Sequence, residues 1–399
     1  MWLYLIIFVI PFIAYKLGGK ENRNKTFLVF YTTFLALFVG LSDMFGGYDR
    51  YIYGNVFDSI ADGVTHGSDI SSIAMLDYFE VGYSALTWLI ACVTENRYIY
   101  ILIITIIIYH NIYKTFERHI NNYPLAFIIF LGMVYFFTFT YLRQVVAFSF
   151  AWLSIQALID GKRKKFFLML VVTALLHKSG IVFAVLLFMP MKKWKPKHVC
   201  MILLGCAIIG LSSVTSSFYD SFASSGIVTG QSNEYSAGGT ARIAYILEVI
   251  FFVWIILKNY DHIEENRENV IFLNMAWAFC GFLLMFVRSS DGGRVSWFFT
   301  MGIIYIITLI ATTNKTKKVI FQQNSVATIM IVVMLFMYVR VYYNWQVYNN
   351  LYPYKTFLTD GYRSPDYSHE RYEYDFNYDN NKFYRPVFRL FKSTTTEWQ

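Results

Sequence analysis

The stretch GKRKKFFLMLVVTALLHKSGIVFAVLLFMPMKKWKPKH, residues 161–198, holds one long apolar run between two basic clusters. Loops rich in Lys and Arg stay on the cytoplasmic side of a membrane, which is the positive-inside rule. Both clusters can lie on that side only if residues 165–191 enter the bilayer and return as a hairpin. The sequence HKSG at 177–180 interrupts the apolar run and is expected to form the tip. The stretch therefore predicts two short membrane helices.

The rest of the chain repeats this pattern of apolar runs and short polar loops. Of the 399 residues, 56% are hydrophobic and only 15% are charged, whereas about a quarter of the residues in an ordinary soluble domain are charged. Runs long enough to cross a bilayer lie at 2–16, 26–45, 97–113, 123–140, 143–160, 199–216, 242–258, 269–287, 295–312 and 325–343. We expect an all-α polytopic membrane protein of about 12 transmembrane helices, within a range of about 10 to 14.

The charged loops suggest how the chain is organised. Residues 81–94 are short for a full crossing and are expected to form a re-entrant or interfacial helix. The basic loops would then all be cytoplasmic, and both termini would lie outside. We expect a single transmembrane helical domain at 1–343 and a Tyr-rich extracytoplasmic tail at 344–399. The net charge of +8 is divided among short loops, so nucleic acid is not an expected partner.

Four arginines are predicted at the outer ends of different helices: Arg143, Arg242, Arg288 and Arg294. A charge within a membrane span costs roughly 3 kcal/mol on insertion scales and needs a partner, a water-filled cavity or a ligand. One Arg at a helix end can simply extend its guanidinium to the interface, but four on the outer face oppose the positive-inside rule. Guanidinium binds phosphate through paired hydrogen bonds. A lipid-linked phosphate or pyrophosphate is therefore the expected ligand.

The same outer segments contain candidates for proton transfer. His177, beside Ser179 at the hairpin tip, is the side-chain type best suited to move a proton near neutral pH. Asp49 and Glu80 lie in the first large outer segment and could act as a base toward a sugar hydroxyl. The aromatic candidates for contact with sugar rings are Tyr53 and Tyr83. The alternatives are a histidine hydrogen-bonded within the bundle, a turn-capping aspartate and tyrosines of the interfacial aromatic belt. No spacing of ligand residues predicts a metal site.

Five short motifs follow one another along the chain. They are YDRYIY at 48–53, FEVGY at 79–83, YLRQVVAFSFAW at 141–152, ALLHKSGIV at 174–182 and GGRVSWFF at 292–299. In their order and spacing they resemble the EpsG family, which belongs with the Wzy-type polymerases of surface polysaccharides. The resemblance extends over residues 40–312, and the Tyr-rich tail lies outside it.

The resemblance implies a glycosyltransferase on the outer face of the bacterial plasma membrane that polymerises a capsule, an O-antigen or an exopolysaccharide. It would transfer the growing chain from one undecaprenyl pyrophosphate carrier to the terminal sugar hydroxyl of a new lipid-linked repeat unit. Arg143 and Gln144 match the family's RQ element, His177 its histidine and Arg294 its late arginine. No cofactor is implied. The implied partners are the lipid-linked oligosaccharide, membrane lipid and a chain-length regulator protein.

Two questions stay open at the level of sequence. The base that deprotonates the acceptor hydroxyl could be His177, Glu80 or Asp49, of which the last two match the family's early acidic positions; His177 is our first choice. The function could also be that of a flippase-like transporter of lipid-linked oligosaccharide, or of a membrane O-acyltransferase that modifies the polysaccharide. Transporters usually show paired repeats, which we do not find, and an acyltransferase would need fewer outer arginines.

Overall fold

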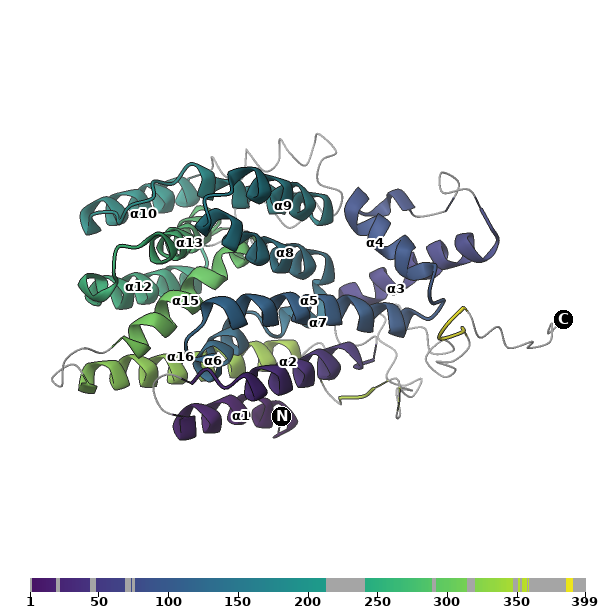
Figure 1. Cartoon of the computed structure of the whole chain (residues 1–399), viewed down its shortest axis with the longest axis horizontal. Helices are drawn as coiled ribbons and strands as arrows, with labels where there is room; N and C mark the ends of the chain where they lie inside the picture. Colours follow the sequence, from purple (N-terminus) through teal and green to yellow (C-terminus); the bar gives the residue numbers. More distant parts are fainter. Residues whose placement is uncertain are drawn as a thin grey trace.

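In the residues that it describes, the computed structural model consists of α-helices and short 3-10 helices (Figure 1). It describes residues 2–18, 22–43, 48–68, 73, 76–212, 241–288, 292–313, 320–346, 351, 354–356, 358 and 385–389. The α-helices are α1 (Trp2–Gly18), α2 (Lys25–Gly40), α3 (Tyr48–Thr65), α4 (Val81–Ala91), α5 (Arg97–His119), α6 (Tyr123–Met133), α7 (Phe137–Thr140), α8 (Leu142–Ile159), α9 (Arg163–Leu176), α10 (Pro196–Leu211), α12 (Ile243–Lys258), α13 (Arg267–Met285), α14 (Gly292–Ser296), α15 (Thr300–Thr312) and α16 (Ile320–Gln346). The 3-10 helices are η3 (Leu76–Tyr78), η4 (Lys178–Leu187), η5 (Tyr260–His262) and η6 (Trp297–Phe299).

The helices have the length and surface of membrane spans. Within the described residues, the segments long and apolar enough to cross a bilayer are Arg97–His119, Leu142–Ile159, Arg267–Met285, Gly293–Thr312 and Val326–Asn344, and several shorter apolar helices accompany them. On α10 the large apolar side chains Met201, Leu204 and Ile208 point outward and are more than half exposed. Lipid accepts such a surface at no cost, whereas water does not. The all-helical structure therefore indicates an integral membrane protein; the number of crossings stays a prediction.

The apolar run at 165–191 is divided at His177. Helix α9 ends at Leu176, His177 adopts an extended backbone with φ −157° and ψ 124°, and η4 begins at Lys178. Gly180 makes the turn possible, because a Cβ atom there would lie 2.7 Å from Thr173 Cγ2 and 3.0 Å from the Thr173 carbonyl oxygen. The residues HKSG thus separate two short helical segments.

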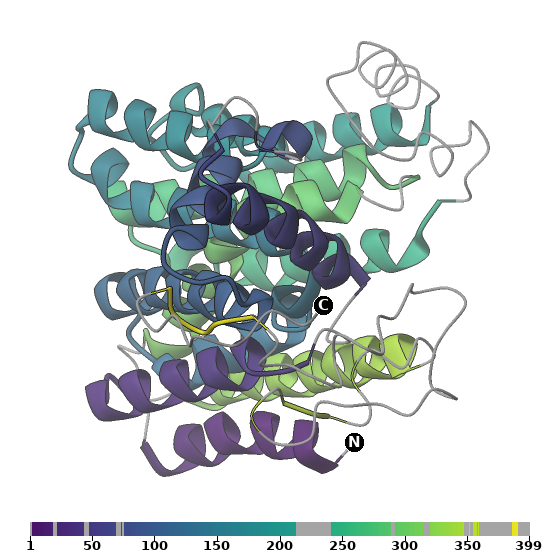
Figure 2. The same ribbon diagram turned by 90° about the vertical axis from the view of Figure 1, so that its right-hand side faces the viewer.

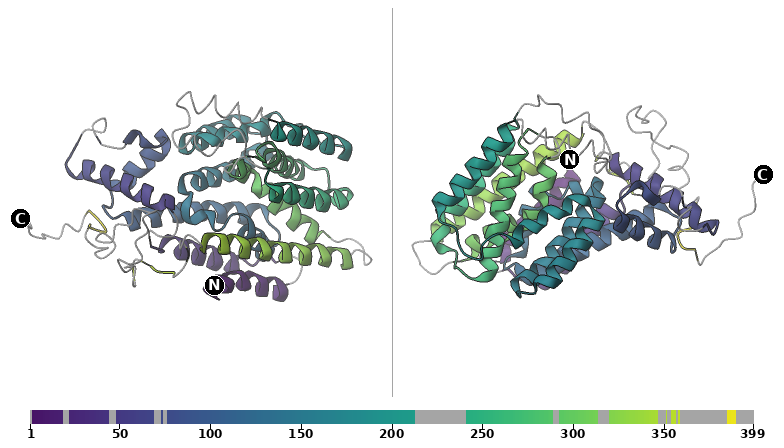
Figure 3. Two further views of the ribbon diagram at one scale, coloured as in Figure 1. Left: turned by 180° about the vertical axis from the view of Figure 1, so that it is seen from behind. Right: turned by 90° about the horizontal axis from the view of Figure 1, so that it is seen from above.

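The helices are stacked in layers (Figure 1), from α9 and α10 at one edge of the bundle to α1 at the other. Neighbours in the stack are α8 with α9, α13 with α10 and α15, α2 with α5, and α6 with α16. Helices α3 and α4 stand beyond one end of this bundle, as both views of Figure 3 show. We call this end the α3–α4 end.

The described basic loops lie at the end of the bundle opposite to α3 and α4, which we call the basic end. Here Arg23 Nη2 donates to the Glu117 carbonyl oxygen at 3.1 Å and Arg267 Nη2 to the Leu158 carbonyl oxygen at 3.0 Å. Lys193 Nζ donates to two carbonyl oxygens around η5, at 2.8 and 2.7 Å. The described basic connections therefore lie together, as the positive-inside argument requires of loops on one side of a membrane.

Buried charges attach α3 to the bundle. The fully buried Arg50 donates to the carbonyl oxygens of Val39, in the last turn of α2, and of Asp43, just beyond it, at 2.7 and 3.1 Å. Asp58 of α3 accepts a hydrogen bond at 3.0 Å from Arg97 Nε, at the start of α5. Figure 2 faces this end and shows the segment 385–389 lying across it. These contacts hold α3 against the bundle, and α4 packs against α3.

Candidate functional site

The site begins where α4 meets the break between α9 and η4. Gly82, in the first turn of α4, allows this approach, because a Cβ atom there would lie 2.8 Å from both Cβ and the carbonyl oxygen of Leu175. The close packing brings Glu80, the N-cap residue of α4, beside His177. Residues 98 positions apart in the sequence, Glu80 and Lys178, are therefore in direct contact.

Glu80 is held by both of its carboxylate oxygens. Oε2 accepts a hydrogen bond from Arg143 Nη1 at 2.7 Å, and Oε1 accepts the backbone N–H of Lys178 at 3.1 Å. The Glu80 side chain is 10% exposed and that of Arg143 is 27% exposed. Charge-assisted hydrogen bonds of this kind are about twice as strong as neutral ones. Glu80 therefore orients Arg143, from α8, and the first residue of η4 at the same time.

His177 is engaged through its Nδ1 atom. This atom accepts the backbone N–H of Ser179 at 3.2 Å and lies 2.7 Å from Ser179 Oγ. Because a backbone N–H can only donate, Nδ1 must carry a lone pair, and the proton of the neutral ring lies on Nε2. In this arrangement His177 caps η4 and presents Nε2–H as a hydrogen-bond donor.

Electrostatics favour an ionised Glu80 and a neutral His177. Burial raises the pKa of the Glu80 carboxyl, but the positive charges of protonated His177 and of Arg143 outweigh burial and leave the pKa below its usual value. Burial lowers the pKa of the His177 imidazole to about 4; Glu80 opposes this effect, while Arg143 and Arg294 add to it. At neutral pH, His177 is thus uncharged, in agreement with its hydrogen bonds.

We call Glu80, Arg143, His177 and Ser179 the Glu80 cluster. Aromatic rings surround its guanidinium. The centre of the Arg143 guanidinium lies 4.6 Å from the ring centroid of Phe79 and 5.9 Å from that of Tyr53. Tyr53 and Tyr83 are both buried, and the Tyr83 hydroxyl accepts a hydrogen bond from Tyr100 at 2.9 Å. The ring faces of Phe79 and Tyr53 therefore stabilise the charge of Arg143, and Tyr83 packs behind both rings, with centroids 5.4 and 6.0 Å away.

Gln144 connects this cluster to the late arginine of the chain. Its Nε2 donates to the Arg294 carbonyl oxygen at 2.8 Å, which fixes α14 against the start of α8. The Arg294 guanidinium lies 4.0 Å from the ring centroid of Tyr141. Tyr141 itself packs against Trp297, with ring centroids 5.5 Å apart. The YLRQ and GGRVSW motifs are therefore in direct contact.

Beyond Arg294 lies a cavity of about 400 Å³, which we call the arginine cavity. It lies between α6, α12, α13, α15 and α16. Its volume is within the range of small-molecule sites. Its charged lining residues are Arg242, Arg294, Arg340 and Glu248. Three guanidinium groups around one hollow can hold a phosphate or pyrophosphate through several charge-assisted hydrogen bonds.

The expected residues are only partly brought together. Arg143, His177, Ser179 and Glu80 form one cluster, and Gln144 links it to Arg294, which lines the cavity with Arg242. Arg288 is exposed just beyond α13 and does not line the cavity. Asp49 lies in the first turn of α3, where its backbone N–H donates to Thr140 Oγ1 at 3.3 Å.

Two charged lining residues were missed in the sequence. Glu248 lies within the apolar helix α12 and Arg340 within α16. The signal that could have found them is the one used for the other arginines, namely an ionisable residue inside a membrane span. Each lies inside a long apolar run, and one charged residue there does not prevent the run from being predicted as a membrane span. Among the described residues, no group of three or more His, Cys, Asp and Glu is arranged to hold a metal ion.

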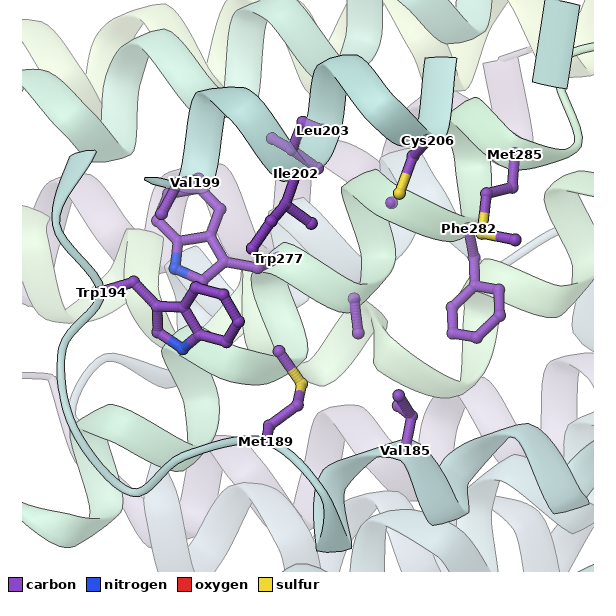
Figure 4. Close-up of a pocket in the computed structure, with 12 residues that line it drawn as sticks. Val185, Met189, Trp194, Val199, Ile202, Leu203, Cys206, Trp277, Phe282 and Met285 are labelled. Carbon is purple, nitrogen blue, oxygen red and sulfur yellow. The ribbon is translucent and has the colours of Figure 1, made fainter. Parts of the chain in front are cut away.

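A second hollow, of about 250 Å³, lies on the opposite face of α13 (Figure 4). It is lined by apolar side chains from η4, α10 and α13, among them Val185, Leu203 and Phe282. Trp194, on its rim, directs its indole N–H to Asn274 Oδ1 at 3.1 Å. This pocket offers a charged group no counter-charge. A phosphate-bearing ligand is therefore matched by the arginine cavity and not by this pocket.

Comparison with known proteins gives one match. The model of the EpsG family matches residues 25–356, which include both the Glu80 cluster and the arginine cavity. No curated protein and no solved structure matches the chain.

Proposed function

The chain belongs to the EpsG family, and from that premise we propose that it is a polymerase of a bacterial surface polysaccharide. Family membership and the apolar helices indicate a polysaccharide-related membrane protein. The finer proposal is a Wzy-type glycosyltransferase. It would transfer a growing glycan from undecaprenyl pyrophosphate to the terminal sugar hydroxyl of a new lipid-linked repeat unit. The product is a capsule, an O-antigen or an exopolysaccharide.

The observation that carries this proposal is the link through Gln144, which follows Arg143 in the chain and donates to the backbone of Arg294 at the arginine cavity. In the proposed reaction, a new bond forms between the acceptor oxygen and the anomeric carbon, and the bond from that carbon to the pyrophosphate breaks. Negative charge develops on the leaving group. Arg294 and Arg242 are placed to stabilise that charge, which is a large source of rate acceleration when the donors are already positioned. A cluster of fixed arginines fits this chemistry.

The Glu80 cluster supplies a second set of polar contacts next to the cavity. Arg143 is held by Glu80, and His177 presents Nε2–H, so both offer donors to the oxygens of a sugar or phosphate. Arg143 therefore remains a positively charged donor even when no ligand is bound. We assign these residues to orienting the substrates, which lowers the barrier by placing the reacting atoms in line.

The proposal also includes an orientation. The α3–α4 end faces outward and the basic end faces the cytoplasm, in keeping with the positive-inside rule. About twelve crossings would connect the two ends. The protein would then be a multi-pass protein of the bacterial plasma membrane with its site on the extracytoplasmic face. The partners would be the lipid-linked repeat units, membrane lipid and a chain-length regulator.

The decisive experiment incubates the purified protein with its own lipid-linked repeat units, isolated from a strain of the source bacterium that lacks this protein. We expect a ladder of chain lengths on a gel, with release of undecaprenyl pyrophosphate. A protein that moves the units across a vesicle membrane without lengthening them would be a transporter. Transfer of an acyl group to the unit would indicate an O-acyltransferase. Either result without a ladder would overturn the proposed function.

A further inference from the structure

Glu248 is an acidic residue in an unusual place. It lies in the second turn of α12, between Leu247 and Val249, in a helix whose other residues are almost all apolar. A carboxylate within a membrane span costs roughly 3 kcal/mol on insertion scales, and such residues mark functional sites by default. Long Lys and Arg side chains at helix ends can extend their charged group to the membrane interface. The shorter Glu side chain cannot reach it in this way. The position therefore requires a specific explanation.

The arginine cavity provides the surroundings of this carboxylate. Glu248 lines it together with Arg242 at the start of α12, Arg294 from α14 and Arg340 from α16. Arg340 is six residues from the end of α16, and Glu248 is five residues from the start of α12. At 1.5 Å per residue, both lie roughly 8 to 9 Å below the helix ends. Glu248 thus lines the same cavity as the three arginines.

The carboxylate of Glu248 also differs from the other acid–base candidates in what it contacts. Both oxygens of Glu80 accept hydrogen bonds, and the Nδ1 lone pair of His177 is used to cap η4. The Glu248 side chain makes no hydrogen bond or ion pair with any of the residues that the structure describes. The positive charge of Arg340, which lines the same cavity, acts on this carboxylate from a longer distance. Its oxygens are therefore available to a ligand inside the cavity.

From this arrangement we propose that Glu248 is the general base that deprotonates the acceptor hydroxyl. This inference rests on the proposed function, because it names a catalytic residue for that reaction. The attacking hydroxyl gives its proton to the Glu248 carboxylate as its oxygen bonds to the anomeric carbon. The bond from that carbon to the pyrophosphate breaks, and the electron pair leaves with the pyrophosphate. The arginines that hold the leaving group lie around the same cavity, so the base and the leaving group face one reacting centre.

The opposite assignment, that Glu248 only neutralises the arginines, makes a different prediction. A counter-ion competes with the anionic ligand, so removing its charge should leave turnover intact and strengthen pyrophosphate binding. A general base contributes about 10²–10⁴-fold to the rate. Removing it should reduce turnover strongly without weakening the binding of the carrier. Turnover therefore separates the two roles, and carrier binding shows that a slow variant still holds its substrate.

The test uses the full-length protein in detergent with the isolated lipid-linked repeat units. Glu248→Gln should reduce the turnover number by about 100-fold or more, whereas its affinity for undecaprenyl pyrophosphate alone should be equal to or higher than that of the wild type. Glu248→Ala should regain activity when sodium formate is added, because formate can occupy the space and accept the proton. Glu264→Gln, an exposed change at the basic end, is the matched control and should behave as the wild type.

The outcomes are distinct. Turnover of Glu248→Gln within tenfold of the wild type, or no gain of Glu248→Ala with formate, would overturn the assignment of the base. If Glu248→Gln fails to fold, Glu248→Asp keeps the charge but withdraws it by one methylene; near-normal turnover of this variant would favour the counter-ion and reject the base. A wild-type protein that binds the carrier yet forms no ladder would overturn the proposed function itself.

Discussion

Replacing Glu80 by Gln removes the charge that holds Arg143 while keeping a side chain of nearly the same size. The variant loses the charge-assisted hydrogen bond at 2.7 Å and can keep the acceptor for the Lys178 N–H. Hydrogen bonds to charged groups contribute about 1.5–3 kcal/mol. Because Arg143 is 27% exposed and water can partly replace its partner, we expect a cost of about 2 kcal/mol. If the full 2 kcal/mol is lost from the binding of the transition state by a misoriented Arg143, the polymerisation rate falls about 30-fold.

A double-mutant cycle measures whether Glu80 acts through Arg143. The polymerisation rate on lipid-linked repeat units would be compared for Glu80→Gln, Arg143→Gln and the double variant. We expect the double variant to be no slower than Arg143→Gln, which gives a coupling of about 2 kcal/mol. Glu117→Gln removes a carboxylate that is paired with Lys114 at the basic end and serves as the control. Rate losses that simply add would show that the two residues act separately and would refute the reasoning.

Three further predictions concern neighbouring positions. Arg294→Ala should abolish long polymer while membrane insertion and abundance stay normal, as judged by gel analysis of the polysaccharide and by immunoblotting; persistence of long chains would contradict its role. Gly82→Val should lower the melting temperature in detergent, because its Cβ atom alone would lie 2.8 Å from Leu175, whereas an unchanged melting temperature would mean that the two helices can separate at no cost. The free energy of unfolding should fall as the pH decreases from about 6.5 to 4, since the unfolded chain binds a proton at His177 (ordinary pKa about 6.5) before the folded protein does (pKa about 4). His177→Asn can still cap η4 and should reduce that slope in thermal melts at several pH values; an equal slope would assign the effect to other groups.

The apolar runs were the most informative part of the sequence. The expected helices at 97–113 and 269–287 correspond to α5 and α13, which begin at Arg97 and Arg267. The break at His177 was also predictable, because two basic clusters flank a run that is too long for one short helix and is interrupted by polar residues. In both cases the signal is local: burial in lipid is decided by neighbouring residues along the chain.

The site was less predictable because its contacts are not local. Nothing in the sequence indicates that Glu80 pairs with Arg143 or that Gln144 contacts the Arg294 backbone, since these pairs are 63 and 150 residues apart. The role of His177 depends on which ring nitrogen accepts a hydrogen bond. Only the position of Ser179 in the structure shows that this nitrogen is Nδ1. Glu248 was hidden for another reason, because one carboxylate hardly changes the hydropathy of a sixteen-residue apolar helix.

The bond from Glu80 to the main chain at position 178 has a consequence for how this motif can vary among relatives. The Glu80 carboxylate accepts a hydrogen bond from the backbone N–H of Lys178, and the lysine side chain takes no part in this bond. Evolution is therefore free to exchange the residue between His177 and Ser179, with proline as the one exclusion, because proline has no N–H to donate. An alignment of distant relatives should then show a variable position between two conserved ones. Proline should be absent from that variable position.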